Sequence, residues 1–199
     1  MLTDMVTRVE RKQRTRAELV SAAQALARDK GFPAITARDV AGAAGVAVGT
    51  VFVHFPTMAS LAETLLDETV GAALQEAHRS LPEAGLIDQL VHVSNTLYQA
   101  YRAEPDLSRE VISASLFEAP SDGPSARRMA EFRSWVGQRV EAAVAAGEIA
   151  PVTGEEAFGG FFALYFGVLV GGLRGELAPA AQAVLLRSLL RRLLQPVGE

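Results

Sequence analysis

The stretch from Thr36 to Phe55, TARDVAGAAGVAVGTVFVHF, constrains the fold of this 199-residue chain more than any other. Thr36 is suited to cap a helix start, and Asp39 three positions later completes a capping-box pattern. Gly45 predicts the end of that helix, because glycine adopts positive φ at little cost. A second short helix is expected over residues 47–53. The stretch therefore predicts a helix-turn-helix, whose second helix can enter a DNA major groove.

Helical spacing predicts which side chains of this motif are buried. The apolar face of the first helix and the plug of the turn are expected to comprise Val40, Ala41, Ala44 and Val46. We expect the second helix to direct Val51 and Phe52 inward. Its exposed residues are then Ala47, Val48, Gly49, Thr50 and Val53. His54 at its end is suited to donate to a phosphate, and the alternative is an ordinary surface or packing histidine.

The string GTVFVHFPT from Gly49 to Thr57, which follows Ala44-Gly45-Val46, resembles the DNA-binding signature of the TetR family of transcriptional regulators. The resemblance covers residues 14–66. It implies that Thr36 approaches the DNA backbone while capping its helix, and that Arg38 reaches a phosphate or a base edge. The full set of DNA-contacting candidates comprises Thr36, Arg38, Ala47, Val48, Gly49, Thr50, Val53, His54 and Thr57.

Three positions depart from the family pattern, and each departure removes a polar partner for DNA. Phe52 stands where tyrosine is usual, Met58 where lysine is usual, and Ala47 where serine is common. Residues 1–13 are expected to form a mobile basic arm. Its cations, with two that follow, either compensate through the minor groove or belong to a solvated tail: Arg8, Arg11, Lys12, Arg14 and Arg16.

Charge is distributed unevenly along the chain. Residues 1–56 carry 8 Lys and Arg against 5 Asp and Glu, a net charge of +3, whereas the whole chain has a net charge of −4. A basic N-terminal segment on an acidic remainder is typical of a DNA-facing domain joined to a domain that does not bind DNA. We therefore expect a DNA-binding domain over residues 1–56 and a ligand-binding and dimerisation domain over residues 57–199.

The remaining chain predicts an all-α fold of about nine helices. Further helices are expected over residues 15–30, 57–80, 86–103, 106–117, 125–146, 155–174 and 179–194. Proline and glycine clusters separate them, and no segment alternates with the period of a strand.

The segment from Ala157 to Leu173 has 17 residues without a charge. That length touches the lower limit for a membrane span. A single glycine-rich stretch preceded by Glu155 and Glu156 is more simply a helix buried on all sides. Together with the last helix it is expected to pair two chains as a four-helix interface, and the TetR resemblance implies the same pairing. The candidate interface residues are Phe161, Gly167, Gly171, Arg174, Val184, Leu185, Leu189 and Leu193.

Aromatic and other large side chains concentrate in the middle helices, where they form either a pocket for an apolar or aromatic molecule or plain core packing. The candidate pocket residues are His92, Tyr98, Tyr101, Phe117, Met129, Phe132, Trp135, Phe162 and Tyr165. Phe161 belongs to the same cluster, and Arg102, Glu118 and Glu131 are candidate neighbours.

The sequence gives little indication of an enzymatic site. The three histidines lie apart, and the chain has no cysteine, P-loop or nucleophile elbow, so we expect no catalysis, metal or cofactor. A polar N-terminus predicts a cytoplasmic protein without a secretory signal. The sequence thus predicts a homodimeric, ligand-responsive repressor that binds a palindromic operator. The alternatives are a regulator that activates or has no ligand, and a helical carrier of apolar molecules with a degenerate helix-turn-helix.

Overall fold

The computed structural model describes residues 2–117 and 124–195, with side chains for residues 8–114 and 125–195. These residues form nine α-helices and one short 3-10 helix, and no strand occurs among them, which confirms the all-α prediction. They divide into two compact units. The N-terminal unit holds residues 2–68 and 106–117, and the C-terminal unit holds residues 69–105 and 124–195. This division differs from the expected boundary after residue 56.

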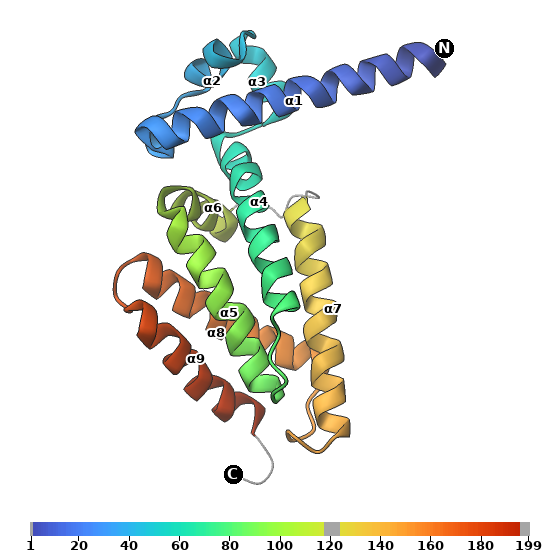
Figure 1. Ribbon diagram of the computed structural model, residues 1–199, viewed down its shortest axis with the longest axis vertical. Coiled ribbons are helices and arrows are strands. Elements are labelled where there is room, and N and C mark those ends of the chain that lie inside the picture. Colours follow the sequence, from blue (N-terminus) through green and yellow to red (C-terminus); the bar gives the residue numbers. More distant parts are fainter. Residues whose placement is uncertain (1, 118–123, 196–199) are drawn as a thin grey trace. The chain divides into compact units, whose positions relative to one another are not determined.

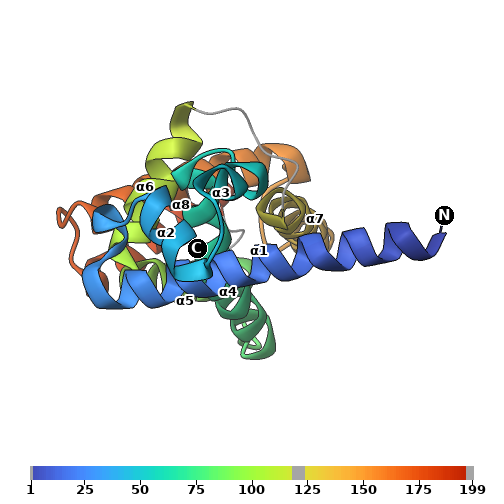
Figure 2. The same ribbon diagram turned by 90° about the horizontal axis from the view of Figure 1, so that it is seen from above.

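The N-terminal unit is built on one long helix. Its elements are α1 (Leu2–Lys30), η1 (Phe32–Ala34), α2 (Ala37–Ala44), α3 (Val48–His54), the first half of α4 (Met58–Arg79) and nearly all of α6 (Pro105–Phe117). Helix α2 packs on both α1 and α3. Figures 1 and 2 show α2 and α3 beside the C-terminal half of α1, whose N-terminal half projects beyond them. The apolar core of this unit includes Leu19, Ala23, Val40, Val51, Phe55, Leu61 and Leu65.

The expectation of a mobile arm over residues 1–13 was wrong for the residues that the structure describes. Helix α1 begins at Leu2, not near Thr15. The segment from residue 2 to residue 14 contains no proline or glycine and is rich in Arg, Lys, Gln and Glu, which all favour helix. Its helicity escaped detection because it carries no apolar stripe to mark a buried face.

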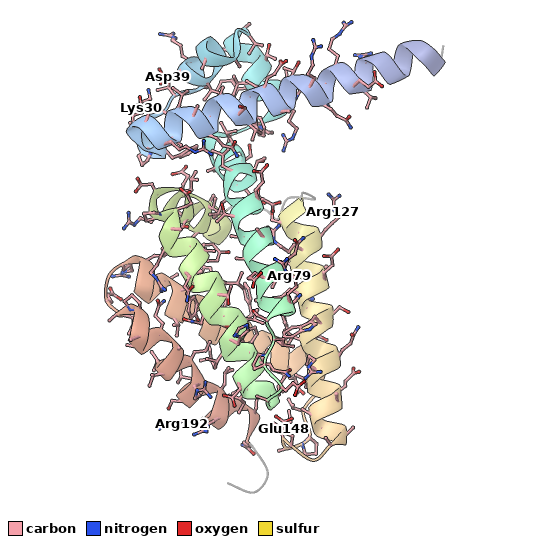
Figure 3. The ribbon with its side chains drawn as sticks, in the orientation of Figure 1. Lys30, Asp39, Arg79, Arg127, Glu148 and Arg192 are labelled. Carbon is pink, nitrogen blue, oxygen red and sulfur yellow. The ribbon has the colours of Figure 1, made fainter. Side chains whose placement is uncertain are left out.

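The C-terminal unit is a bundle around α8 (Gly154–Leu173). Helix α8 packs on α5 (Leu86–Ala103), α7 (Pro124–Ala145) and α9 (Pro179–Leu194). Thr153 and Glu156 form a capping box at its start. Across the bundle, Glu148 follows α7 and accepts a hydrogen bond from the Leu86 N–H at the start of α5; Figure 3 labels Glu148. The predicted helix boundaries in this unit agree with the observed ones to within one residue.

Helix α8 is long and apolar enough to cross a membrane, judged by length and composition alone, and 44% of its most apolar window is buried within the structure. Core helices of soluble proteins have the same length and composition. Here the buried side packs on neighbouring helices through Ala157, Phe158, Phe161, Tyr165, Val168 and Leu169. The packing accounts for the absence of charge on that side.

Candidate DNA-binding interface

The start of α2 is held by the predicted capping box. The Thr36 hydroxyl accepts from the Asp39 N–H at 3.2 Å, and Asp39 Oδ2 accepts from the Thr36 N–H at 2.8 Å. The hydrogen bond from the Thr36 hydroxyl, then that from its N–H, then Lys30, lower the pKa of Asp39 to about 2. Lys30 Nζ lies 3.2 Å from the carboxylate, so the end of α1 is tied to the start of α2 (Figure 3).

The turn between α2 and α3 requires a glycine. Gly45 has φ 68° and ψ 29°, in the left-handed region. The Val46 N–H donates to the Ala41 carbonyl at 3.0 Å, which closes the end of α2 in the geometry of a Schellman motif. The predicted helix, glycine turn and second helix therefore occur as expected.

Helix α3 has one buried and one exposed side. Val51 and Phe55 are each 1% exposed and anchor the helix to the core. The prediction that Phe52 faces inward was wrong, because Phe52 is 47% exposed. Val51 and Phe55 are four residues apart and occupy the inward side, and Phe52 lies about 100° around the helix from Val51. The spacing of Val51 and Phe55 was the signal that could have placed Phe52 outside.

Arg16 has a structural role that the sequence did not predict. Its Nη1 donates to the His54 carbonyl oxygen at 3.1 Å and its Nη2 to Thr64 Oγ1 at 3.1 Å. The guanidinium also lies 4.2 Å from the centre of the Phe55 ring. Arg16 thus joins α1 to the end of α3 and to α4, which is inconsistent with the solvated tail, one of the two alternatives given for this cation.

His54 lies half-buried at the end of α3, beside cations of α1. Burial, then the positive charges of Lys12 and Arg16, lower the pKa of its imidazole. Arg8, Lys12 and Arg16 recur at intervals of four residues and so share one face of α1. Arg8 and Lys12 are exposed, which places a positive stripe on the face of α1 that carries Arg16.

Every DNA-contacting candidate lies in the N-terminal unit, on α2, α3 or the residues that cap them and α4. Thr57 caps α4 by accepting from the Ser60 N–H at 3.0 Å. Two candidates, Thr50 and His54, are half-buried. The others are exposed: Thr36, Arg38, Ala47, Val48, Gly49, Val53 and Thr57. Their contacts with DNA remain predictions.

The candidate pocket residues are only partly brought together. In the C-terminal unit an extended network of ring contacts includes Tyr98, Phe132, Trp135, Phe158, Phe161, Phe162 and Tyr165. Tyr98 stacks on Tyr165 at 5.2 Å and donates its hydroxyl to the Tyr165 carbonyl at 3.1 Å. Burial raises the pKa of both phenols. His92 instead contacts Ser80 Oγ at 3.1 Å.

Three further candidates do not extend the ring network. Met129 is 41% exposed on α7. Arg102 donates to the buried amide of Gln182. Glu131 is exposed. Tyr101, in contrast, lies near the network: burial, then the charge of Tyr101 and a hydrogen bond with it, raise the pKa of Tyr165. The Phe117 side chain and Glu118 lie outside the described residues.

Two of the candidate interface residues are interior residues of this chain. Phe161 is 0% exposed and contacts the rings of Phe132 and Tyr165. Gly171 is buried, and a Cβ there would lie 2.9 Å from a methyl carbon of Leu177. Both were expected at the surface because α8 is apolar all round, and the structure corrects that expectation. The remaining candidates are exposed except for the half-buried Leu189: Gly167, Arg174, Val184, Leu185 and Leu193.

Sequence comparisons find similarity between this chain and bacterial regulatory proteins. A family described as "Bacterial regulatory proteins, tetR family" matches residues 19–65, which run from α1 through α2 and α3 into α4. The HTH-type transcriptional regulator CymR of Pseudomonas putida is 33% identical over 89 residues. The matched segment spans 43% of this chain and 44% of CymR, less than half of that protein.

Solved structures share the fold of nearly the whole chain. FadR of Thermus thermophilus, a TetR family transcriptional repressor solved in complex with lauroyl-CoA, has a TM-score of 0.68 at 22% identity, covering 89% of this chain and 92% of FadR. RolR in complex with resorcinol also has a TM-score of 0.68, at 13% identity, covering 92% and 89%. At such identities the likeness shows the fold.

Proposed function

Because this chain belongs to the TetR family of bacterial regulatory proteins, we propose that it is a cytoplasmic, homodimeric repressor that binds a palindromic DNA operator and releases it when a small apolar molecule binds. The observation that carries the proposal is the α2–turn–α3 unit. Its caps, its left-handed glycine and its buried anchors hold one side of α3 fixed in the core and leave the other side open.

Helix α3 is the proposed recognition helix. Its seven residues span about 10 Å at 1.5 Å per residue, which is too short to read more than a few base pairs. Two copies related by a two-fold axis read both halves of a palindrome, with the half-sites about 34–36 Å apart or at a multiple of that spacing. A repressor of this design requires a dimer.

The exposed residues of α8 and α9 support that dimer. Val184 is 69% exposed and the adjacent Leu185 is 37% exposed, whereas Leu193, 38% exposed, lies about 180° around α9 from Val184 and does not belong to the same side. Large apolar side chains on one helix at such exposure are typical of a surface that a partner covers. Gly167 on α8 and Arg174, the residue that follows α8, complete the proposed patch, which pairs with the same patch of a second copy about a two-fold axis.

An effector of apolar or aromatic character is supported by the aromatic interior of the C-terminal unit. FadR and RolR are solved with lauroyl-CoA and resorcinol, molecules with a long acyl chain and an aromatic ring. Helix α4 contributes residues to both units, so it is the proposed lever between effector and DNA. The effector must prefer the state that does not bind DNA, because equal affinity for both states shifts nothing.

A second function is favoured by the lack of polar side chains at three positions of the DNA-binding surface. Ala47, Phe52 and Met58 offer DNA no hydrogen bond from their side chains. A carrier of apolar molecules that has lost DNA binding accounts for the same substitutions. Activation of transcription, or regulation without a small molecule, are variants of the main proposal.

A gel-shift titration separates these functions. The full chain is titrated against duplex DNA flanking its own gene at several salt concentrations, with unrelated DNA as competitor. The repressor predicts a specific complex that Arg38→Ala weakens and that the matched variant of an exposed arginine in the other unit, Arg127→Ala, leaves unchanged (Figure 3). Failure to form a specific complex at any salt concentration supports the carrier.

A further inference from the structure

The exposed side of α3 is apolar at its centre. Val53 is 72% exposed, the highest exposure among the large hydrophobic residues that the structure describes, and Gly49 is also exposed. At 100° per residue both residues lie roughly 160° from the buried Val51, directly opposite the core. A Cβ at Gly49 would have nothing within 4 Å. The middle of the recognition surface therefore consists of one isopropyl group beside bare backbone.

The flanks of this surface add little hydrogen-bonding capacity. Phe52, 47% exposed, and Val48, 37% exposed, lie on one side of the Gly49–Val53 ridge, and Thr50 lies on the other. The sequence of α3, VGTVFVH, contains no Arg, Lys, Asn, Gln, Asp or Glu. The bidentate pairs that read guanine and adenine edges in the major groove are thus unavailable to α3.

The major groove offers an apolar side chain one matching group. Guanine, cytosine and adenine edges present hydrogen-bond donors and acceptors there, whereas thymine adds its C5-methyl group. Burying Val53 against a polar base edge would desolvate that edge without replacing its hydrogen bonds, which is unfavourable. Contact with a methyl group removes apolar surface of both partners from water and is favourable.

We propose that this chain selects its operator through thymine methyl groups, with Val53 as the principal specificity-determining residue and Phe52 as its neighbour. The proposal rests on the proposed DNA-binding function and deepens it. Each half-site then carries thymine at the base pairs that face α3. The exposed cations of α1, Arg8 and Lys12, hold the phosphate backbone and contribute affinity that does not depend on sequence.

The test separates the methyl group from every hydrogen bond of the base. Random-sequence duplexes are enriched by repeated binding to the purified full chain, and the selected duplex is resynthesised with deoxyuridine replacing one thymidine at a time. Deoxyuridine keeps the pairing and the O4 acceptor and lacks only the methyl. We expect at least one replacement in each half-site to weaken binding about four-fold, the effect of one apolar carbon removed from water.

Val53→Ala completes a double-mutant cycle. The substituted helix is expected to fold, because position 53 is exposed and alanine is the strongest helix former. In this variant the deoxyuridine effect should fall below two-fold at the same thymine, and Val9→Ala, which alters an exposed valine of α1, should preserve it. Specific binding that no deoxyuridine replacement changes overturns the methyl proposal and leaves the repressor standing. If the selection enriches no sequence, both the methyl proposal and the proposed repressor are overturned.

Discussion

The guanidinium of Arg16 donates a hydrogen bond to the carbonyl oxygen of His54 at 3.1 Å. This bond joins the middle of α1 to the last residue of α3, and a second bond from Arg16 to Thr64 Oγ1 extends the link to α4. A carbonyl at a helix C-terminus lacks an intrahelical donor and carries partial negative charge, so a cation is well placed there. The orientation of the proposed recognition helix therefore depends on a residue 38 positions earlier in the chain.

Arg16→Ala should destabilise the protein by about 1–2 kcal/mol, because it removes two charge-assisted hydrogen bonds and the contact with the Phe55 ring. Urea denaturation followed by helical circular dichroism measures the change. Arg14→Ala is the matched control: its side chain is 77% exposed and, among the described side chains, forms a surface ion pair with Glu18, so a loss below about 0.5 kcal/mol is expected. Equal losses in the two variants would contradict the structural role of Arg16.

Asp39 should make stability depend on pH in the acid range. Its pKa falls from 3.8 to about 2 on folding, so the folded state favours the carboxylate. The contribution is complete above about pH 4 and disappears as the pH falls toward 2. Asp39→Asn should flatten the dependence of the urea midpoint on pH between 4 and 2. A slope in the variant equal to that of the wild type would assign the acid sensitivity to other carboxylates.

DNA binding should strengthen as the pH falls from 8 to 6. Burial and the charges of Lys12 and Arg16 lower the pKa of His54 in the free protein, which favours the neutral ring. A DNA phosphate favours the protonated ring, so complex formation raises that pKa and takes up a proton. His54→Gln should reduce the pH slope of the dissociation constant measured by fluorescence anisotropy. His92→Gln, an alteration in the other unit, should retain it.

The positive stripe of α1 should contribute to the salt dependence of binding. Lys12→Ala is expected to lower the slope of log K against log salt by about 0.9, the value for one lost phosphate contact. Arg8→Ala should act in the same way, and deletion of residues 1–13 should weaken binding further. Arg192→Ala, at an exposed position on α9, serves as the control (Figure 3). An unchanged affinity at fixed salt after the deletion would remove this part of α1 from the mechanism.

The proposed dimer should dissociate when a charge enters its apolar patch. Val184→Glu and Leu185→Glu each place a carboxylate on the exposed side of α9, where pairing would bury it. Sedimentation velocity should then report a monomer, while helical circular dichroism stays at the wild-type level. Met129→Glu alters a residue of α7 whose exposure, 41%, is close to that of Leu185, and it should leave the dimer intact. A dimer that persists in both α9 variants would place the interface elsewhere.

Local signals predicted the helix-turn-helix well. The Thr36–Asp39 capping box and the left-handed Gly45 involve residues no more than five positions apart, so their hydrogen bonds close within less than two helix turns. The same reasoning placed the Thr57 cap of α4. The errors concern α1, whose first half forms a helix without an apolar stripe, and the facing of single side chains such as Phe52.

By itself the sequence determined the helices that follow residue 14, the caps at Thr36 and Thr57 and the glycine turn, because these depend on bonds between near neighbours. Only the tertiary structure decided that Arg16 joins three helices, that Phe161 is interior, and that Phe52 is exposed on α3. An amphipathic pattern identifies a face but not the partner that covers it. Burial is a property of the packed helices together, and it emerges only when residues far apart in the chain are placed in contact.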